Sequence, residues 1–253
     1  RLFADAEFVY CRDTDSLAYL QQRNLLAKRM GYRPDSTFFF GGSDEAWADE
    51  YMQRHGLEEG RFITLTIRTS EQPGPLYGVM SKERSEEHMA KLRAFIEAWT
   101  ERTGMKVLLC PEVRHEIEPA REYLYDRVSE RARRHCVWMD SFWTSEQAYS
   151  IYRRALIVVS MEMHSVIMAV GIGTPVLHPQ FAESGRKARM VRDIGLGDWL
   201  FDIDAMRTED LLEAALKIHQ DPEAARRRVR AALHRLEQLG AGMMQLVRRL
   251  GRY

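Results

Sequence analysis

An acid and an imidazole stand two residues apart in an otherwise apolar stretch, VVSMEMHSVIMAVGIGTPV, at residues 158–176. They are Glu162 and His164. A neutral imidazole near the start of a helix can act as a general acid or base, or donate a hydrogen bond to an anion. The alternative for His164 is a core histidine bonded to a backbone carbonyl. Glu162 also has an alternative, because an acid in the first turn of a helix interacts favourably with the helix dipole.

Two cationic residues are further candidates for chemistry. Arg68 ends another apolar run, where a guanidinium can hold a phosphate or carboxylate through two parallel hydrogen bonds. Lys187 lies in the polar segment FAESGRKARMVRDIG and is a second candidate anion ligand. An ordinary solvated side chain is the alternative for both. The sequence contains no nucleophile elbow, Walker pattern or metal-ligand spacing, and we expect no metal.

The elements that would position these residues follow from residue 61 onward. Short apolar runs rich in β-branched residues alternate there with longer segments of helical period. This alternation predicts an α/β fold with a Rossmann-like parallel sheet and helices on both faces. The expected strands are residues 61–68, 106–111, 136–140, 156–160 and 175–179.

Ligands bind beyond the carboxyl ends of parallel strands, because helix N-termini present unpaired N–H groups there. Polar residues that directly follow the expected strands are therefore the site candidates. They are Arg68, Glu112, His115, Asp140, Ser141, the group from Ser160 to Ser165 and the group from His178 to Lys187. His115 and His178 are too isolated in the sequence to be proposed as metal ligands.

Three local signals predict helices. Residues 85–104 carry apolar side chains at spacings of three and four and end at Gly104, a pattern typical of an amphipathic helix with a glycine stop. Thr144 and Gln147 form a capping-box pattern. Asp221 followed by Pro222 predicts the start of a C-terminal helix, whose arginine-rich stretch we interpret as a solvated face.

The composition limits the possible partners. The 37 basic and 37 acidic residues cancel, so no global field attracts nucleic acid, and we expect no nucleic-acid partner. The three cysteines form no paired spacing, which favours a reducing, cytoplasmic setting over a disulfide framework. No run of 18 apolar residues is present, so we expect any membrane contact to be peripheral.

Three segments of the chain resemble the polysaccharide pyruvyltransferases. The first two are CRDTDSLAYL and RPDSTF, which are similar to an arginine-acid-x-x-serine element and a proline-aspartate segment of that family. The third is residues 158–202, which resemble the core signature of the family. In that signature a strand leads to a histidine-containing helix, a glycine-threonine-proline turn, a lysine and a leucine-glycine segment.

The resemblance implies a GT-B-like fold, in which two Rossmann-like domains face a cleft. Residues 1–40 would close an N-terminal domain that is only partly represented, 41–60 would form a linker, 61–220 the C-terminal Rossmann-like domain and 221–253 C-terminal helices. We expect most of the N-terminal domain to precede residue 1.

The activity implied by the resemblance is transfer of a pyruvyl group, as a ketal, to a sugar of a surface polysaccharide. Phosphoenolpyruvate would be the donor substrate, and no cofactor is implied. The acceptor would be a sugar or polysaccharide precursor, and a lipid-linked acceptor would bring the enzyme to a membrane surface.

Several residues match functional positions of the family. His164 matches the signature histidine, the proposed acid-base group. Arg68 and Lys187 match cations expected to hold the donor, and we expect Glu162 and Ser165 to bind the donor as well. Other motif positions, for which a mainly structural role is expected, are Arg12, Asp13, Ser16 and Asp35.

Glu162 is the point at which the chain departs from the family pattern. The family usually has arginine two residues before the histidine, whereas this chain has Glu162-Met163-His164. Two unit charges 4 Å apart interact by roughly 4 kcal/mol at an effective dielectric of 20, so this exchange would shift donor binding by several kcal/mol.

Three explanations of Glu162 stay open. Other cations, among them Arg186 or Arg189, compensate for it; or the donor differs; or the site has been altered. The competing functions are accordingly a pyruvyltransferase, a GT-B enzyme that uses a nucleotide sugar and a non-catalytic relative.

Overall fold

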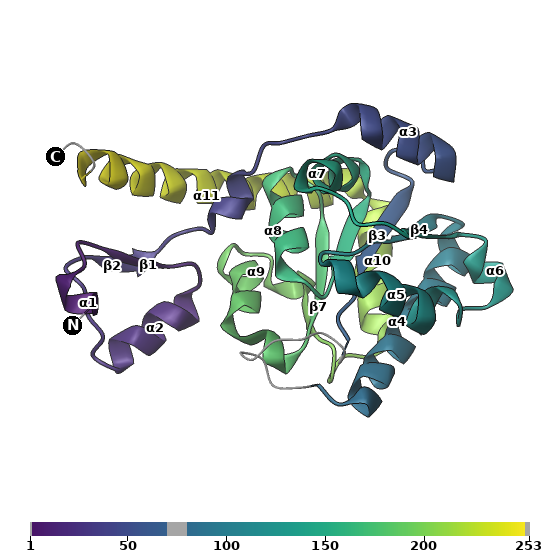
Figure 1. Ribbon diagram of the computed structural model, residues 1–253, viewed down its shortest axis with the longest axis horizontal. Helices are drawn as coiled ribbons and strands as arrows, with labels where there is room; N and C mark the ends of the chain where they lie inside the picture. The colour runs from purple at the N-terminus through teal and green to yellow at the C-terminus, as the bar shows by residue number, and fades with distance from the viewer. Residues whose placement is uncertain (1, 70–79, 251–253) are drawn as a thin grey trace.

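A computed structural model gives the structure of residues 2–69 and 80–250 (Figure 1). Within these ranges the strands are β1 (Val9–Cys11), β2 (Met30–Tyr32), β3 (Phe62–Thr66), β4 (Lys106–Leu109), β5 (Cys136–Trp138), β6 (Ile157–Ser160), β7 (Val176–Gln180) and β8 (Leu200–Asp202). The last six form one parallel sheet in the order β5-β4-β3-β6-β7-β8. β1 and β2 pair separately, also in parallel.

Helices cover both faces of the six-stranded sheet. The α-helices are α1 (Leu2–Asp5), α2 (Thr14–Gln22), α3 (Glu45–His55), α4 (Lys82–Thr103), α5 (Ile117–Ala120), α6 (Glu130–Arg133), α7 (Ser145–Arg154), α8 (Met163–Gly171), α9 (Arg189–Asp193), α10 (Thr208–Gln220) and α11 (Pro222–Leu250). The other helical segments, which have 3₁₀ or π geometry, are η1 (Ser36–Phe39), η2 (Arg114–Glu116), η3 (Arg121–Tyr125), η4 (Ala182–Ala188) and η5 (Gly197–Trp199). α4 and α10 pack together on one face, and α7 and α8 pack on the other.

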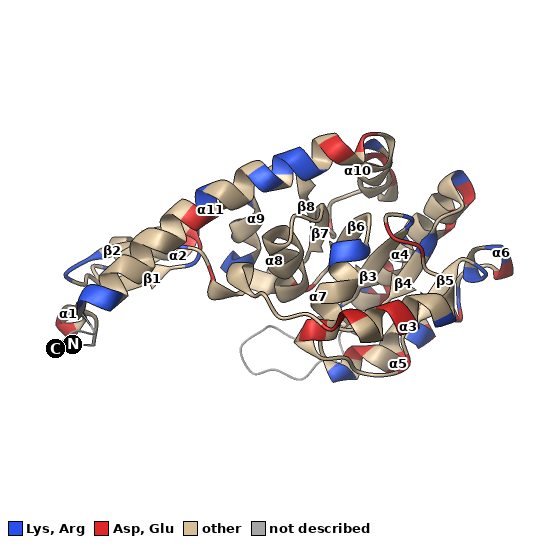
Figure 2. Ribbon diagram, turned by 90° about the horizontal axis from the view of Figure 1, so that it is seen from above, with Lys and Arg blue, Asp and Glu red and all other residues tan. Residues whose placement is uncertain are grey.

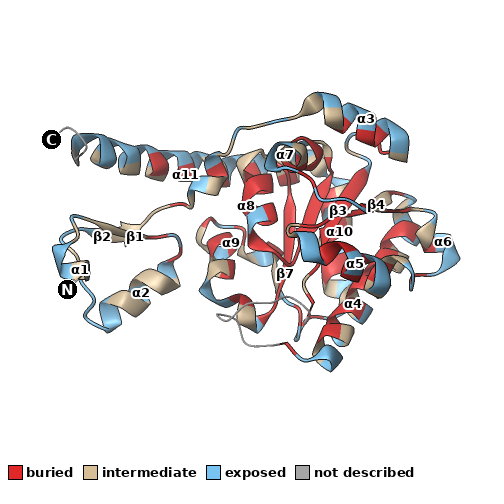
Figure 3. Ribbon diagram, viewed as in Figure 1, coloured by how far each residue is buried: buried red, intermediate tan, exposed pale blue. Residues whose placement is uncertain are grey.

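The predicted α/β sheet is confirmed, and each of the five expected strands is present. Every residue of β3 is buried, because helices cover both of its faces, and this is why its sequence is continuously apolar (Figure 3). α4 ends at Gly104, which adopts a left-handed conformation with φ of 65°. α7 starts with the predicted capping box of Thr144 and Gln147.

Other elements differ from the prediction. β8 had no sequence signal, because it is a three-residue edge strand whose residues are only partly buried or exposed. Phe38 and Phe39 of the apolar run FFF end η1, and β2 is the partner of β1. At the C-terminus, where helices were expected, α11 is one continuous helix, and residues 251–253 lie outside the described ranges.

α11 has one buried stripe and one solvated face. Its buried residues are Ala225, Val229, Ala232, Leu236 and Gly240, spaced three and four apart. The arginines of α11, coloured blue in Figure 2, are all exposed or only partly buried, in accordance with a solvated charge run. None of the helices in the described ranges combines the length and apolar character needed to cross a bilayer.

The segment around η1 passes close to both α8 and α11. Phe38 is buried, and a Cβ atom at Gly171, the last residue of α8, would lie 2.2 Å from the Phe38 carbonyl oxygen. On α11, a Cβ atom at Gly240 would lie 2.7 Å from the ring of Phe39. Glycine at residue 171 therefore allows the backbone of η1 to approach α8.

The substitution Gly171→Ala tests this close approach. We expect it to lower the free energy of unfolding by about 1 to 3 kcal/mol, because two backbones must separate to admit the methyl group. Gly242→Ala in α11 is the matched control, since nothing lies within 4 Å of the added Cβ. It should leave stability unchanged or raise it by up to about 1 kcal/mol through helix propensity. Urea unfolding of both variants checks the prediction, and equal stabilities would contradict it.

Candidate functional site

The strand order reverses between β3 and β6, which lie side by side in the middle of the sheet. In parallel sheets of this kind the crevice beyond the carboxyl ends at the reversal is the usual ligand site. Arg68 lies two residues after β3, and Glu162 lies two residues after β6. The fold therefore brings these two predicted site residues to the same edge.

Glu162 is buried between two cations. Its side chain is 5% exposed; Nη1 of Arg68 donates to Oε1 at 2.6 Å, and Nζ of Lys187 lies 3.6 Å from Oε2. The carboxylate does not cap the described first turn of α8. The Ser160 hydroxyl donates to the Glu162 carbonyl oxygen at 2.8 Å and accepts from its N–H at 2.9 Å. Ion pairing, rather than the helix dipole, accounts for an acid at this position.

His164, which follows β6, is anchored by a carboxylate that follows β4, on the far side of β3 in the sheet. Glu112 follows β4, and its Oε1 lies 3.1 Å from Nδ1 of His164. Its Oε2 accepts from the amide of Ser165 at 2.6 Å and from the Ser165 hydroxyl at 2.8 Å. Since a carboxylate only accepts, Nδ1 carries the hydrogen and Nε2 is left for a ligand. With 54% of its side chain exposed, His164 is not a core histidine.

The pair shifts the pKa of both partners. The hydrogen bond to Glu112 raises the pKa of His164, although burial acts in the opposite direction. The charge of Asp35 raises it further, and that of Lys187 lowers it. Burial alone would raise the pKa of Glu112, but hydrogen bonds from His164 and Ser165 outweigh it and the pKa is lowered. Both shifts favour an imidazolium at His164 beside a carboxylate at Glu112. An imidazolium held in this way can donate a proton in a fixed orientation.

Buried polar groups hold Glu112 in place. The Tyr152 hydroxyl lies 3.0 Å from Oγ of Ser165, which in turn donates to Glu112. Oε2 of Glu116 accepts from the amide of Glu112 at 2.6 Å and from the next amide at 3.1 Å. Burial, together with the charge of Glu162, raises the pKa of Glu116 to about 8. The raised pKa favours the neutral form of Glu116 beside the other two carboxyl groups.

Two hollows lie beside these residues. The first, the β5-side hollow, has a volume of about 690 Å³ and is lined by Pro111, Glu112, Val113, Arg114, Phe142, Trp143, Thr144, Ser145, Glu146, Ala148, Tyr152, His164, Ser165 and Met168. The second, the η4-side hollow, has a volume of about 430 Å³ and is lined by Tyr10, Cys11, Arg12, Asp13, Ser16, Ser184, Gly185, Arg186 and Lys187. His164 lines the first, and Lys187, a partner of Glu162, lines the second.

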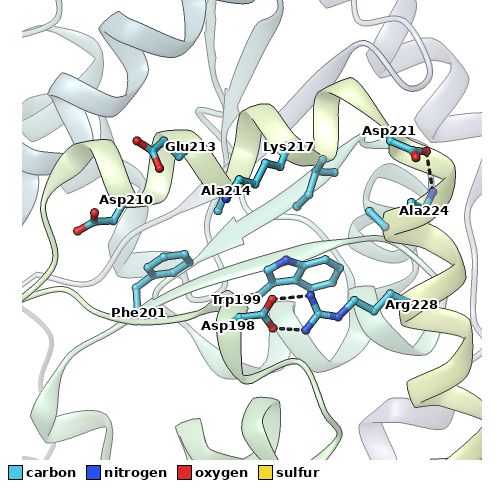
Figure 4. Close-up of a pocket in the computed structure, with 12 residues that line it drawn as sticks. Asp198, Trp199, Phe201, Asp210, Glu213, Ala214, Lys217, Asp221, Ala224 and Arg228 are labelled. Atoms are coloured by element: carbon cyan, nitrogen blue, oxygen red, sulfur yellow. Dashed lines mark hydrogen bonds and ion pairs between the residues drawn. The ribbon is translucent and has the colours of Figure 1, made fainter.

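A third hollow of about 440 Å³ lies among η5, β8, α10 and α11 (Figure 4). The Arg228 guanidinium pairs with Asp198 and lies 4.7 Å from the centre of the Trp199 ring. The lining of this hollow includes none of the site residues predicted from the sequence.

The N-terminal motif residues shape the segment from residue 9 to residue 40. Asp13 caps α2 by accepting from the Ser16 amide at 2.6 Å. Arg12 pairs with Asp35 at 2.8 Å, and Asp35 accepts from the amide of Thr37 at the start of η1. These contacts agree with the structural role expected for the motif, although Arg12, Asp13 and Ser16 also line the η4-side hollow.

The other strand-end candidates are distributed differently. His178 is buried and its Nδ1 donates to the Ser160 carbonyl oxygen at 2.6 Å, while burial lowers its pKa to about 4. His115, Asp140 and Ser141 are exposed. Ser165, predicted as a donor ligand, uses its hydroxyl to support Glu112 in the described structure, and donor contact by it stays a prediction. Across residues 2–69 and 80–250, no group of His, Cys, Asp and Glu side chains is arranged to hold a metal ion.

Comparison with solved structures defines the class of fold. The chain is similar to an α,α-trehalose-phosphate synthase (UDP-forming) from Burkholderia vietnamiensis, with a TM-score of 0.54, 10% identity and coverage of 96% of this chain and 61% of that one. It is also similar to a UDP-N-acetylglucosamine 2-epimerase from Rickettsia bellii, with a TM-score of 0.54, 9% identity and coverage of 96% of this chain and 62% of that one. The S. aureus MnaA–UDP co-structure matches with a TM-score of 0.57, 10% identity and coverage of 89% of this chain and 55% of that one. The fold is α/β and GT-B-like, and the chain spans less than two thirds of each of these structures.

The family follows from the sequence match. The chain belongs to the polysaccharide pyruvyl transferase family, whose model matches residues 1–178. No curated protein matches the sequence significantly. The matched range includes β1 to β6, α8 and the His164–Glu112 pair.

Replacing Glu112 tests the pairing with His164. In Glu112→Gln the hydrogen bond loses its charge, so we expect the pKa of His164 to fall and its ring to deprotonate at lower pH than in the wild type. Titration of the imidazole C–H signals by NMR measures this shift. Glu118→Gln, an exposed acid on nearby α5, is the control and should leave the titration of His164 unchanged. Equal titration of His164 in both variants would disprove the pairing.

Proposed function

We propose that the protein transfers a pyruvyl group from phosphoenolpyruvate to a sugar of a surface polysaccharide, forming a ketal, with His164 as the acid-base group. The observation that supports this most is the His164–Glu112 pair at the carboxyl edge of the sheet, two residues from the Glu162 ion-pair cluster. Membership of the pyruvyl transferase family supports the same reaction class.

The chemistry requires one group that both gives and takes a proton. C2 of the enolpyruvyl group forms two bonds to sugar hydroxyl oxygens, the bond from C2 to the phosphate oxygen breaks, and C3 gains a proton to become a methyl group. One hydroxyl proton balances the proton gained by C3, and the other leaves with phosphate. Protonated His164 would supply the proton to C3, and neutral His164 would accept one from an attacking hydroxyl.

The anionic donor would bind on the side of Arg68 and Lys187. Phosphoenolpyruvate carries a phosphate and a carboxylate, and Arg12 and Arg186 add positive charge to the η4-side hollow. Glu162 pairs with both Arg68 and Lys187, so it competes with the donor for these cations. We therefore expect weaker donor binding than in a relative that has arginine at this position.

A nucleotide-sugar transferase is the second candidate. The MnaA co-structure contains UDP, and the trehalose-phosphate synthase is described as UDP-forming. The β5-side hollow, at about 690 Å³, is within the usual size range of a small-molecule site. Thermal shift with phosphoenolpyruvate and with UDP-sugars separates the two candidates, since each predicts stabilisation by its own donor.

The setting of the reaction follows from the proposed substrates. A sugar or polysaccharide precursor would be the acceptor, and a lipid-linked precursor would hold the enzyme at the membrane surface. All three cysteines are buried free thiols, which is compatible with a reducing cytoplasm.

Replacing His164 tests the proposed role. In His164→Ala we expect pyruvyl transfer to fall by about 10²- to 10⁴-fold, the usual contribution of a general acid or base. Phosphate release and mass spectrometry of the sugar product, over a panel of polysaccharide precursors, measure turnover. His115→Ala is the control, because this histidine is exposed and belongs to η2. Wild-type turnover in His164→Ala would rule out the assignment, provided that both variants melt at similar temperatures.

A further inference from the structure

We infer that the β5-side hollow binds a neutral sugar ring, so that His164 separates a carbohydrate subsite from the anion-binding side. The inference rests on the proposed function, because it assigns the acceptor to this hollow. Its support is the chemistry of the lining residues and the state of the two helix N-termini that reach it.

An exposed aromatic ring forms one wall of the hollow. Phe142 is 39% exposed, and the guanidinium carbon of Arg114 lies 5.2 Å from the centre of its ring. The neighbouring Trp143 is buried instead, and its Nε1 donates to the Pro111 carbonyl oxygen at 2.8 Å. Trp143 is therefore part of the scaffold, and Phe142 is the aromatic surface that a ligand can contact. Such a surface suits the apolar face of a sugar ring.

At each of the two helix N-termini that reach the hollow, a side chain already accepts a hydrogen bond from a backbone amide of the first turn. At the start of α7, the hydroxyl oxygen of Thr144 accepts from the Gln147 amide at 3.3 Å. The side-chain oxygen of Gln147 accepts in turn from the Thr144 amide at 2.9 Å. At the start of α8, the amide of Ser165 donates to Glu112 at 2.6 Å. A phosphate would normally bind through such amides. Internal hydrogen bonds that already use these amides argue against an anionic ligand here.

The charges of the lining support the same conclusion. The carboxylates of Glu112 and Glu146 both line the hollow, together with Arg114 and His164. A phosphate placed here would face two acids beside Arg114 and His164, whereas the η4-side hollow contains three cations, Arg12, Arg186 and Lys187, and only one acid. Carboxylates instead accept hydrogen bonds from hydroxyl groups, which a neutral sugar supplies in number.

The position of the hollow suits an acceptor. His164 and Glu112 are part of its lining, so a sugar in contact with Phe142 would lie on the same side of the sheet edge as the imidazole. Nδ1 of His164 contacts Glu112, so the other ring nitrogen, Nε2, would then face the attacking hydroxyl. At about 690 Å³ the hollow has room for a hexose ring together with part of a neighbouring residue of the acceptor.

The experiment is saturation-transfer NMR with methyl pyranosides of glucose, galactose and mannose, run without phosphoenolpyruvate. We expect at least one pyranoside to bind the wild type, and we expect its signal to fall at least fivefold in Phe142→Ala and to persist in Phe142→Tyr. Phe39→Ala is the matched control, since Phe39 is 43% exposed but lies on η1 and should not affect binding. Excess inorganic phosphate should not displace the sugar.

Other outcomes would overturn the inference. No pyranoside binding to the wild type, equal binding by Phe142→Ala and the wild type, or displacement by inorganic phosphate would each contradict it. Displacement by UDP would favour a nucleotide in this hollow instead. Because binding is measured without turnover, a failure of pyruvyl transfer does not affect this result. Loss of sugar binding in Phe142→Ala with full pyruvyl transfer would reject the acceptor subsite alone.

Discussion

Burial of the Glu162 carboxylate constrains the whole carboxyl edge of the sheet. A buried carboxylate without a partner costs several kcal/mol, so the fold must bring cations to it. Arg68 comes from the end of β3 and Lys187 from η4, while Glu162 itself follows β6. Three segments that are distant in the sequence are thereby held together at the point where the strand order reverses. The two cations and the carboxylate of this contact contribute charge to the crevice there.

A second carboxylate network meets the first at the start of α8. Glu112 links the end of β4 to the amide of Ser165 and to the ring of His164, and Glu116 holds the backbone of Glu112. Glu162 precedes α8 and His164 is its second residue, so one helical turn belongs to both networks. The same turn therefore carries His164, which lines the β5-side hollow, and follows Glu162, whose partner Lys187 lines the η4-side hollow.

The sequence predicted the features that depend on local pattern. β3 and β6 are apolar and β-branched because both lie inside the sheet, and the helix signals at Gly104 and Thr144 are short-range hydrogen-bond and backbone effects. The strand-end rule also found Arg68, His164 and Glu112 as site candidates. The family resemblance, drawn from three segments, agrees with the family match over residues 1–178.

The pairings within the site could not be predicted in the same way. Glu112 and His164 are 52 residues apart, and Arg68 and Glu162 are 94 apart, so their contacts depend on the order of strands in the sheet. That order cannot be read from hydrophobic periodicity. Glu162 is an example. In the sequence its position is equally compatible with helix capping and with a binding role, and only the folded chain shows that it lies between two cations. β8 was not predicted for a different reason, because a short and partly exposed edge strand contains too few buried apolar residues to form a recognisable pattern.

Under the proposed function, Arg68 and Lys187 bind the anionic donor, and the charge of Glu162 sets the donor affinity. Isothermal titration of phosphoenolpyruvate into the wild type, Glu162→Gln and the control Glu118→Gln measures this affinity. We expect Glu162→Gln to bind about tenfold more tightly than the wild type, because the removal of one competing charge is worth about 1.4 kcal/mol in this setting. Glu118→Gln should bind as the wild type does. Equal or weaker binding by Glu162→Gln would show that Glu162 does not compete with the donor.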